Sequence, residues 1–141
     1  MLLERGIVAS IVGVDISAAA LSRAGERCRR FPVARFVRGN LAVEAPDGPF
    51  DLIVCAETLY YLGGASASAA CALLTDRVAP DGRIVAVHPA SHSESLHHAW
   101  TMDSRLTRER RECVSDAARP YVIEVFRRDG DTNVPRSETG P

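Results

Sequence analysis

The sequence has 141 residues, a length typical of one globular domain, and its 46% apolar and 25% charged residues are typical of a folded, soluble protein. The net charge of -1 gives no electrostatic basis for general binding to nucleic acids or membranes. All 17 basic residues are arginine, which excludes lysine chemistry such as Schiff bases and a P-loop lysine.

The cysteine pattern and the N-terminus predict a cytoplasmic protein. Cys28, Cys55, Cys71 and Cys113 are irregularly spaced, and three of them fall in apolar patterns typical of buried helices or strands. We therefore expect reduced thiols. The opening "MLLERG" has no signal-peptide hydrophobic region, and no apolar run is long enough to span a membrane.

The first third of the chain predicts a strand, a helix and a second strand. "MLLERG" resembles the last turns of a helix that ends at Gly6, and because no N-cap precedes it we expect the sequence to begin inside an element. Residues 10–15 form a continuous apolar run, typical of a buried parallel strand. Ser17 is suited to cap a helix that extends to about Arg29. Residues 34–39 then predict a short alternating strand.

The middle of the chain continues the alternation. Residues 40–50 are rich in turn residues and predict a loop. Residues 50–56, "FDLIVCA", form a second continuous apolar run and therefore predict a central strand. Residues 67–78 place alanine and leucine at helical spacing, and "APDG" is expected to end that helix.

The C-terminal part predicts two more strands. Residues 83–89 form an apolar strand, and 92–100 predict a helix. Residues 105–112, "RLTRERRE", mix basic and acidic side chains and are interpreted as the solvated face of a helix. Residues 121–128 alternate as an edge or near-edge strand does. Residues 129–141 have little to bury and are expected to be disordered. Strands that alternate with helices indicate an α/β fold with a mainly parallel sheet.

Histidines gather late in the sequence. His88 ends a predicted strand, and His92, His97 and His98 follow closely together with Glu94. Because no zinc-type spacing is present, we expect no metal site. Two interpretations stay open: His88 acts as a base on the substrate side, or these are ordinary surface histidines.

Three segments carry a resemblance to a known family: "GIVASIVGVDISAAALSRAGERC", "FDLIVCAETLYYLG" and "LLTDRVAPDGRIVAVHP". Together they resemble class I S-adenosylmethionine-dependent methyltransferases, and within them the nodulation-type N-methyltransferases. The resemblance covers about residues 1–90 and returns at 121–128. It implies a Rossmann-like sheet with flanking helices and S-adenosylmethionine as cofactor.

The resemblance also implies a cofactor side of the site. Asp15, at the end of its strand, corresponds to the acid that accepts both ribose hydroxyls, a role that suits a carboxylate because it offers only acceptors. Ile16 corresponds to the apolar contact with adenine. Asn40 stands where relatives carry an aspartate that touches the adenine amino group. Leu41 and Ala56 complete the expected cofactor-binding set. The structural alternatives are a helix-capping role for Asp15 and a local turn at Asn40.

Glu57 and Tyr60 are the expected catalytic residues on the acceptor side. They follow the strand at 50–56, at the carboxyl edge where open α/β sheets bind ligands. Glu57 would orient an amine or hydroxyl group, or accept its proton. Tyr60 and Tyr61 would flank the substrate or the methionine end. The alternative makes Tyr61 and Leu62 core residues of a following helix.

The family's glycine-rich loop has no counterpart here. None of the ten glycines lies two residues from another, so the sequence has no G-x-G. In the family, that loop and its strand bind the methionine end, and the strand lies between those represented here by residues 10–15 and 50–56. We therefore expect an N-terminally truncated class I fold, with residues 1–128 as a partial methyltransferase domain. It would be a fragment, a degenerate binding domain, or a chain whose missing segment a partner, such as a second copy, supplies.

The resulting functional expectation is methyl transfer from S-adenosylmethionine to N or O of a small molecule, with no nucleic acid or membrane partner. The isolated chain is expected to be inactive or nearly so. One alternative is a non-catalytic interaction domain that keeps the fold. A third is a fragment of a dinucleotide-dependent oxidoreductase, because such enzymes also use an acid after the second strand.

Overall fold

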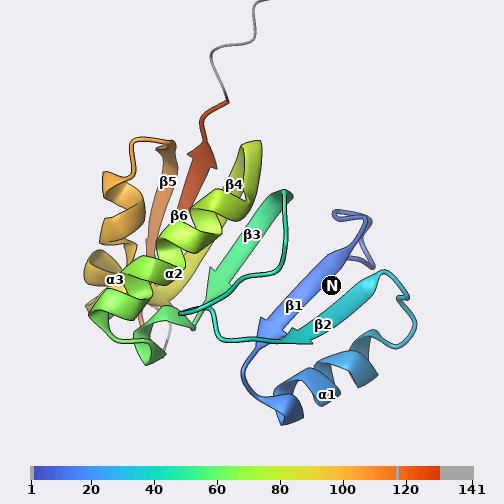
Figure 1. The fold of residues 1–141 in the computed structure, drawn as a ribbon. Helices are drawn as coiled ribbons and strands as arrows, with labels where there is room; N and C mark the ends of the chain where they lie inside the picture. The colour runs from blue at the N-terminus through green and yellow to red at the C-terminus, as the bar shows by residue number, and fades with distance from the viewer. Residues whose placement is uncertain (1, 117, 131–141) are drawn as a thin grey trace, which may run out of the picture. The chain divides into compact units, whose positions relative to one another are not determined.

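The computed structural model describes residues 2–116 and 118–130. The chain divides into two compact units, residues 1–47 and 48–141, and each unit has its own sheet (Figure 1). The expected disordered tail lies outside the described residues from 131 onward. In the described part, no helix combines the length and the apolar character that crossing a membrane requires.

The first unit is a single β-α-β element. Strand β1 (Ile11–Asp15) pairs in parallel with β2 (Ala34–Arg38), and helix α1 (Ala18–Cys28) connects them. The predicted cap is confirmed, since the Ser17 hydroxyl oxygen accepts a hydrogen bond from the Ala20 amide at 3.2 Å. This cap fixes the turn that follows β1.

Gly6 has the role predicted for it, although the residues before it form turns rather than a helix. Its φ is +63°, and its amide donates to the Leu3 carbonyl while the Ile7 amide donates to the Leu2 carbonyl. This pair of bonds is the one by which a glycine ends a helical turn.

The second unit is built on four strands in the order β3-β4-β6-β5. Its elements are β3 (Phe50–Ala56), the 3-10 turn η1 (Leu59–Tyr61), α2 (Gly64–Arg77), β4 (Val78–Pro89), α3 (Ala90–Met102), β5 (Leu106–Val114) and β6 (Tyr121–Arg128). Strands β3 and β4 are parallel, whereas β6 runs antiparallel to both β4 and β5. The near-edge position predicted for residues 121–128 is confirmed.

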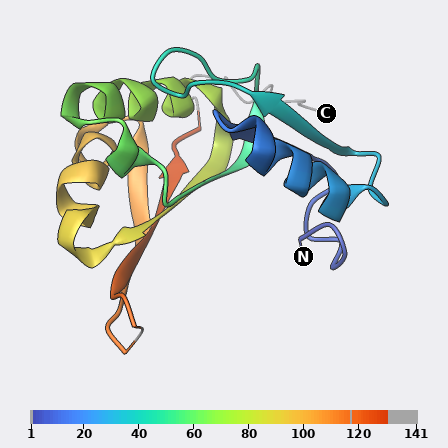
Figure 2. The ribbon, with the colours of Figure 1, turned by 90° about the horizontal axis from the view of Figure 1, so that it is seen from below.

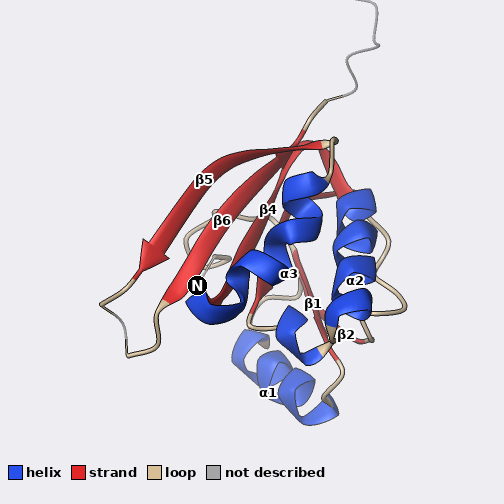
Figure 3. Cartoon of the chain, turned by 90° about the vertical axis from the view of Figure 1, so that its left-hand side faces the viewer, coloured by secondary structure: helices blue, strands red, loops and turns tan. Residues whose placement is uncertain are grey.

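Helices α2 and α3 contact each other and lie on the same side of the four-stranded sheet (Figures 2 and 3). The core lies between these helices and the sheet, where Ile84, Phe126 and Trp100 are fully buried. The Trp100 indole donates to the Cys71 carbonyl at 3.1 Å and its ring lies 5.9 Å from that of Phe126. This packing joins α3, α2 and β6.

The boundaries differ from the predicted ones where local signals compete. Strand β4 begins at Val78 rather than at residue 83, because the "APDG" turn residues run on within the strand, where Asp81 takes a φ of +61°. Helix α2 begins at Gly64 and α3 spans Ala90–Met102, so both start earlier than the hydrophobic spacing indicates.

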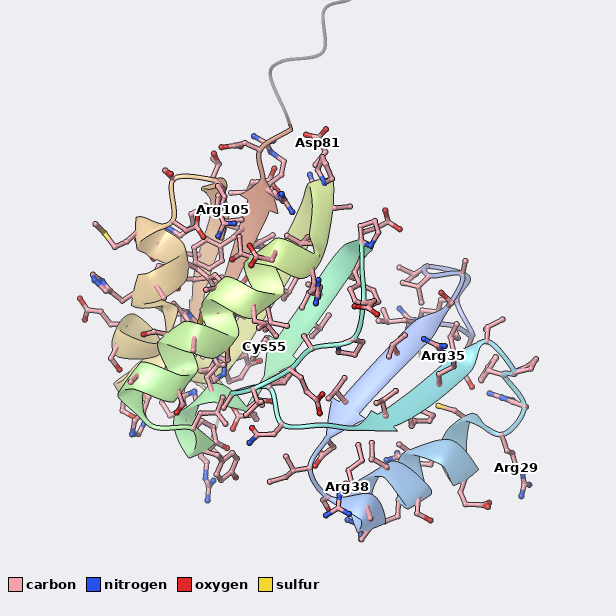
Figure 4. The ribbon with its side chains drawn as sticks, in the orientation of Figure 1. Arg29, Arg35, Arg38, Cys55, Asp81 and Arg105 are labelled. Atoms are coloured by element: carbon pink, nitrogen blue, oxygen red, sulfur yellow. The ribbon has the colours of Figure 1, made fainter. Side chains whose placement is uncertain are left out.

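The helix expected at 105–112 is wrong, because residues 106–112 are part of β5. Its charged side chains pair across strands: Glu109 contacts Arg83 at 2.9 Å and Arg127 at 3.1 Å. Arg105, just before β5, reaches Asp76 at the end of α2 at 2.6 Å (Figure 4). Long-range pairing with β6, and not local periodicity, therefore decides the conformation.

The four cysteines are all free. Cys55 and Cys71 are buried, as their patterns predict, Cys28 is half-buried and Cys113 is exposed. Burial raises the pKa of both the Cys55 and the Cys71 thiol to about 12. These two thiols therefore stay protonated and act as small apolar side chains.

The α/β class with flanking helices is confirmed. The sheets are mixed rather than mainly parallel as expected, because β6 runs antiparallel to both of its neighbours: two strand pairings are parallel and two are antiparallel. Within the described ranges, β1 pairs only with β2, and β3 pairs only with β4. Among the described residues, strands 11–15 and 50–56 thus belong to different sheets.

Candidate functional site

In the second unit, the candidate site is the turn that follows β3. Ala56 lies opposite Val87, so the carboxyl ends of β3 and β4 meet at this edge. Glu57 takes a φ of +55°, a strained conformation for a residue with a side chain. Its amide donates to the Val87 carbonyl at 2.9 Å, and the Thr58 hydroxyl donates to the Ala56 carbonyl at 2.8 Å. These bonds hold the strained turn.

Glu57 and Tyr60, the two predicted acceptor-side residues, are brought together. The Tyr60 hydroxyl donates to Oε2 of Glu57 at 3.0 Å, and it lies 3.2 Å from the Tyr61 hydroxyl. The Tyr61 hydroxyl, with some burial and the Glu57 carboxylate, raises the pKa of Tyr60 above its usual value. Tyr60 thus stays protonated and Glu57 acts as an acceptor.

Tyr61 is 77% exposed, so its alternative assignment to the core is wrong. The core residue of this turn is Leu59, which is fully buried in η1. The turn therefore inserts Leu59 into the core and leaves Tyr60 and Tyr61 at its surface.

The interpretation of all the histidines as surface residues is wrong for His88 and His97, which are 0% and 1% exposed. Nε2 of His88 accepts the Leu59 amide at 3.3 Å, and its Nδ1 lies 2.9 Å from Nε2 of His97. Nδ1 of His97 pairs with the buried Glu124 carboxylate. Burial, with a smaller effect of His97, lowers the pKa of His88 to about 4. Since both ring nitrogens of His88 are engaged, the geometry does not favour it as a substrate-side base.

In the first unit, Asp15 ends β1 beside the start of α1. Its Oδ1 accepts the Ser17 amide at 2.8 Å, and among the described residues this is the only hydrogen bond to the carboxylate. Oδ2 is thus available to a ligand. Ile16 is 66% exposed, and its carbonyl accepts from Nε of Arg38 at 3.1 Å, which holds the turn from the end of β2 (Figure 4).

Asn40 lies at the same edge of the first unit, because the neighbouring Gly39 amide donates to the Asp15 carbonyl at 3.1 Å. Its Oδ1 accepts the Ala42 amide at 3.0 Å, the bond of a local turn, and its side-chain N–H groups face no described partner. Leu41 is half-buried next to it. Ala56, the fifth expected cofactor residue, is exposed at the end of β3 in the second unit.

Among the residues described, no three histidine, cysteine or acidic side chains are grouped so that they could hold a metal ion. Sequence reasoning missed Leu59, His97 and Glu124. A signal existed for Glu124, because it occupies the inward position between Val122 and Phe126 on an alternating strand. An acid at such a position needs buried partners.

A family model described as a methyltransferase domain matches residues 1–82. No curated protein matches the sequence. The chain is similar to the N-methyltransferase NodS from Bradyrhizobium japonicum WM9, with 23% identity and a TM-score of 0.75 over 85% of this chain and 74% of that one. For NodS in complex with S-adenosyl-L-homocysteine, the identity is 23% and the TM-score is 0.76 over 84% and 66%.

A third similar structure is magnesium protoporphyrin IX methyltransferase from Synechocystis PCC 6803 with bound SAM, with 18% identity and a TM-score of 0.71. The match covers 88% of this chain and 62% of that one, so the chain spans less than two thirds of that relative. At these identities the structures show the fold. The chain has the class I methyltransferase fold and, through the match over residues 1–82, belongs to the methyltransferase domain family.

Proposed function

We propose that this protein takes part in S-adenosylmethionine-dependent methyl transfer to a nitrogen or oxygen of a small molecule. The observation that carries the proposal is the Asp15 carboxylate at the end of β1, which uses one oxygen for the Ser17 amide and leaves the other available. The similar structures with bound SAH and SAM support the cofactor. The proposal includes no nucleic acid or membrane partner.

The residues of the first unit fit the adenosine part of this cofactor. Two adjacent ribose hydroxyls are donors, and the Asp15 carboxylate offers acceptors without competing donors. The exposed Ile16 side chain offers apolar surface to an adenine ring. The side-chain N–H groups of Asn40 are available to the acceptor nitrogens of adenine, and its oxygen keeps one lone pair.

The second unit supplies the acceptor side. S-adenosylmethionine, when bound, offers a methyl group activated by its sulfonium sulfur. Glu57 would orient the N–H or O–H group of the acceptor and would take up the proton that this group loses when it is methylated. Tyr60 holds the Glu57 carboxylate through its hydroxyl at 3.0 Å. The main contribution of the protein is thus positioning.

The test is calorimetric titration with S-adenosyl-L-homocysteine, with Asp15→Ala compared with the parent chain. Loss of two hydrogen bonds to a charged acceptor predicts about 100-fold weaker binding. Glu26→Gln is the matched control, because Glu26 is an exposed acid of the same unit on α1. It should bind the ligand as the parent does.

The outcomes separate the alternatives. Binding that Asp15→Ala weakens, together with methyl transfer to amines or alcohols that Glu57→Gln abolishes, supports the proposal. Binding without turnover indicates a non-catalytic domain. Binding of a nicotinamide dinucleotide, but not of S-adenosyl-L-homocysteine, would overturn the proposal in favour of an oxidoreductase.

A further inference from the structure

A chain of buried polar side chains runs through the second unit to the candidate acceptor site. It consists of His88 on β4, His97 on α3 and Glu124 on β6, none more than 3% exposed. All three lie after residue 82, where the match to the family model ends. We call these three residues the buried relay.

The Leu59 amide fixes the direction of every hydrogen bond in the buried relay. A backbone N–H can only donate, so Nε2 of His88 must carry a lone pair and its proton lies on Nδ1. That proton is donated to Nε2 of His97, which places the His97 proton on Nδ1, facing Glu124. Both histidines are therefore neutral, with the proton on Nδ1, and Glu124 is the ionised acceptor.

The charge of Glu124 is balanced from the edge strand β5. Its Oε1 accepts from the Arg108 guanidinium at 3.0 Å and lies 3.4 Å from Nε of Arg111. These arginines border a hollow of about 370 Å³ between α3 and β5. Arg108 and Arg111, beside Glu124, are thus partly exposed to solvent, whereas His88 is fully buried.

Stability alone gives little reason for this arrangement. Burying a carboxylate and two imidazoles costs free energy, and apolar side chains of similar volume would often stabilise the fold more. The buried relay ends on the Leu59 amide, in the turn that carries Glu57 and Tyr60. Glu57 is held at a φ of +55°, so this turn needs support from outside.

We infer that His88, oriented by His97 and Glu124, is a positioning residue that fixes the Leu59 amide and thereby the Glu57–Tyr60 pair for the methyl acceptor. This inference rests on the proposed function for its catalytic consequence. Two bonds from consecutive residues of β4 then hold the turn: the Val87 carbonyl accepts from Glu57, and the His88 ring accepts from Leu59. Among the described residues, no hydrogen bond joins His97 or Glu124 to residues 57–61, so His88 is the member of the buried relay that bonds to the turn.

The first test does not depend on activity or on any variant. Nitrogen NMR of the full chain at neutral pH should show His88 and His97 with unprotonated Nε2 and protonated Nδ1. A His88 ring protonated on Nε2 would contradict the inference, because that nitrogen could not accept from Leu59. This measurement tests the inference whether or not methyl transfer is detected.

The second test uses Glu124→Gln, which removes the charge but keeps an acceptor oxygen for His97. We expect shifted Leu59 and Tyr60 resonances and a 10- to 100-fold lower kcat/KM for the acceptor, a size typical of small misplacements. The affinity for S-adenosyl-L-homocysteine should not change, because Asp15 lies in the other unit. His98→Gln, an exposed neighbour of His97 on α3, is the matched control.

Each outcome decides between the two proposals. If the NMR tautomers are as expected but no acceptor is methylated, the proposed function fails and the positioning of the turn stands. If methyl transfer occurs and Glu124→Gln leaves the Leu59 resonance and the acceptor kcat/KM unchanged, the inference fails and the proposed function stands. His88→Gln, which offers a substitute acceptor, should retain more activity than His88→Leu.

Discussion

The two units of the chain differ in the internal packing that stabilises each of them. All the buried side chains that the structure describes lie in the second unit, between Cys55 and Phe126, and none lies in residues 2–47. The second unit covers one face of its sheet with two helices that also pack on each other. The first unit has two strands and one helix, and its apolar side chains are at best half-buried.

The difference follows from size and layering. A short segment encloses little volume relative to its surface, and parallel strands are usually covered on both faces. One helix can cover only one face of β1 and β2. The stability of the first unit therefore depends on local interactions, which are the Ser17 helix cap and the packing of Phe36 against Gly13. The stability of the second unit depends on a buried core.

The largest expected effect is that of core truncation in the second unit. Phe126→Ala should lower the free energy of unfolding by about 3–5 kcal/mol, because a fully buried ring leaves a cavity. Phe36→Ala, the matched change in the half-buried first unit, should cost about 1 kcal/mol. Urea unfolding curves followed by circular dichroism measure both. Equal losses of unfolding free energy in the two variants would contradict the difference in packing between the units.

The next effect is a loss of stability in acid, specific to the buried relay. His88 is protonated near pH 6.5 when unfolded but only near pH 4 when folded, so stability is complete above 6.5 and falls between these values. Burial lowers the pKa of His97 as well, and the groups that face it are His88, Glu124 and Arg111. For His88 alone, the loss at about pH 5 is about 2 kcal/mol.

Urea unfolding of the parent chain and of His88→Gln at about pH 7.5 and about pH 5 measures this loss. The variant removes one titrating group and should lose less stability on acidification than the parent. An equal loss in both chains would mean that His88 titrates normally and is not sealed in the core.

A smaller effect tests the packing of the first unit. A Cβ on Gly13 would lie 2.7 Å from Cδ1 of Phe36, so Gly13→Ala should cost about 1–3 kcal/mol through overpacking. Gly25→Ala is the matched control, because a Cβ in that position on α1 meets nothing within 4 Å. It should stabilise the helix by about 0.5–1 kcal/mol. Amide exchange of β1 and α1 measures both changes.

The sequence predicts an element well where its signal is local. The apolar runs at 10–15 and 50–56 predict β1 and β3, and Ser17 predicts the start of α1. Strand β5 is different, because its conformation depends on pairing with β6 and on ion pairs such as Arg83–Glu109, across 26 positions. A local pattern of charges does not contain that information.

The same distinction holds for the candidate site. Glu57 and Tyr60 follow a central strand, so their position at the carboxyl edge could be predicted, and their hydrogen bond lies within one turn. His97 and Glu124 are 27 positions apart in the sequence. Their hydrogen bond joins helix α3 to strand β6, which is separated from β3 in the sheet by β4. Only the inward acid on β6 pointed to it.

The smallest expected effect asks whether the two units unfold together. Ser17→Ala removes the α1 cap, which accepts the Ala20 amide, and should cost about 1 kcal/mol. Ser22→Ala, at an exposed position inside α1, is the control and should cost nothing.

The single tryptophan, Trp100, lies in the core of the second unit, so its fluorescence reports on that unit alone. If the units are independent, Ser17→Ala leaves the Trp100 transition in place while α1 amides exchange about fivefold faster, since that is the equilibrium equivalent of about 1 kcal/mol. A Trp100 transition that moves by the full amount would mean that the core of the second unit also sustains the first.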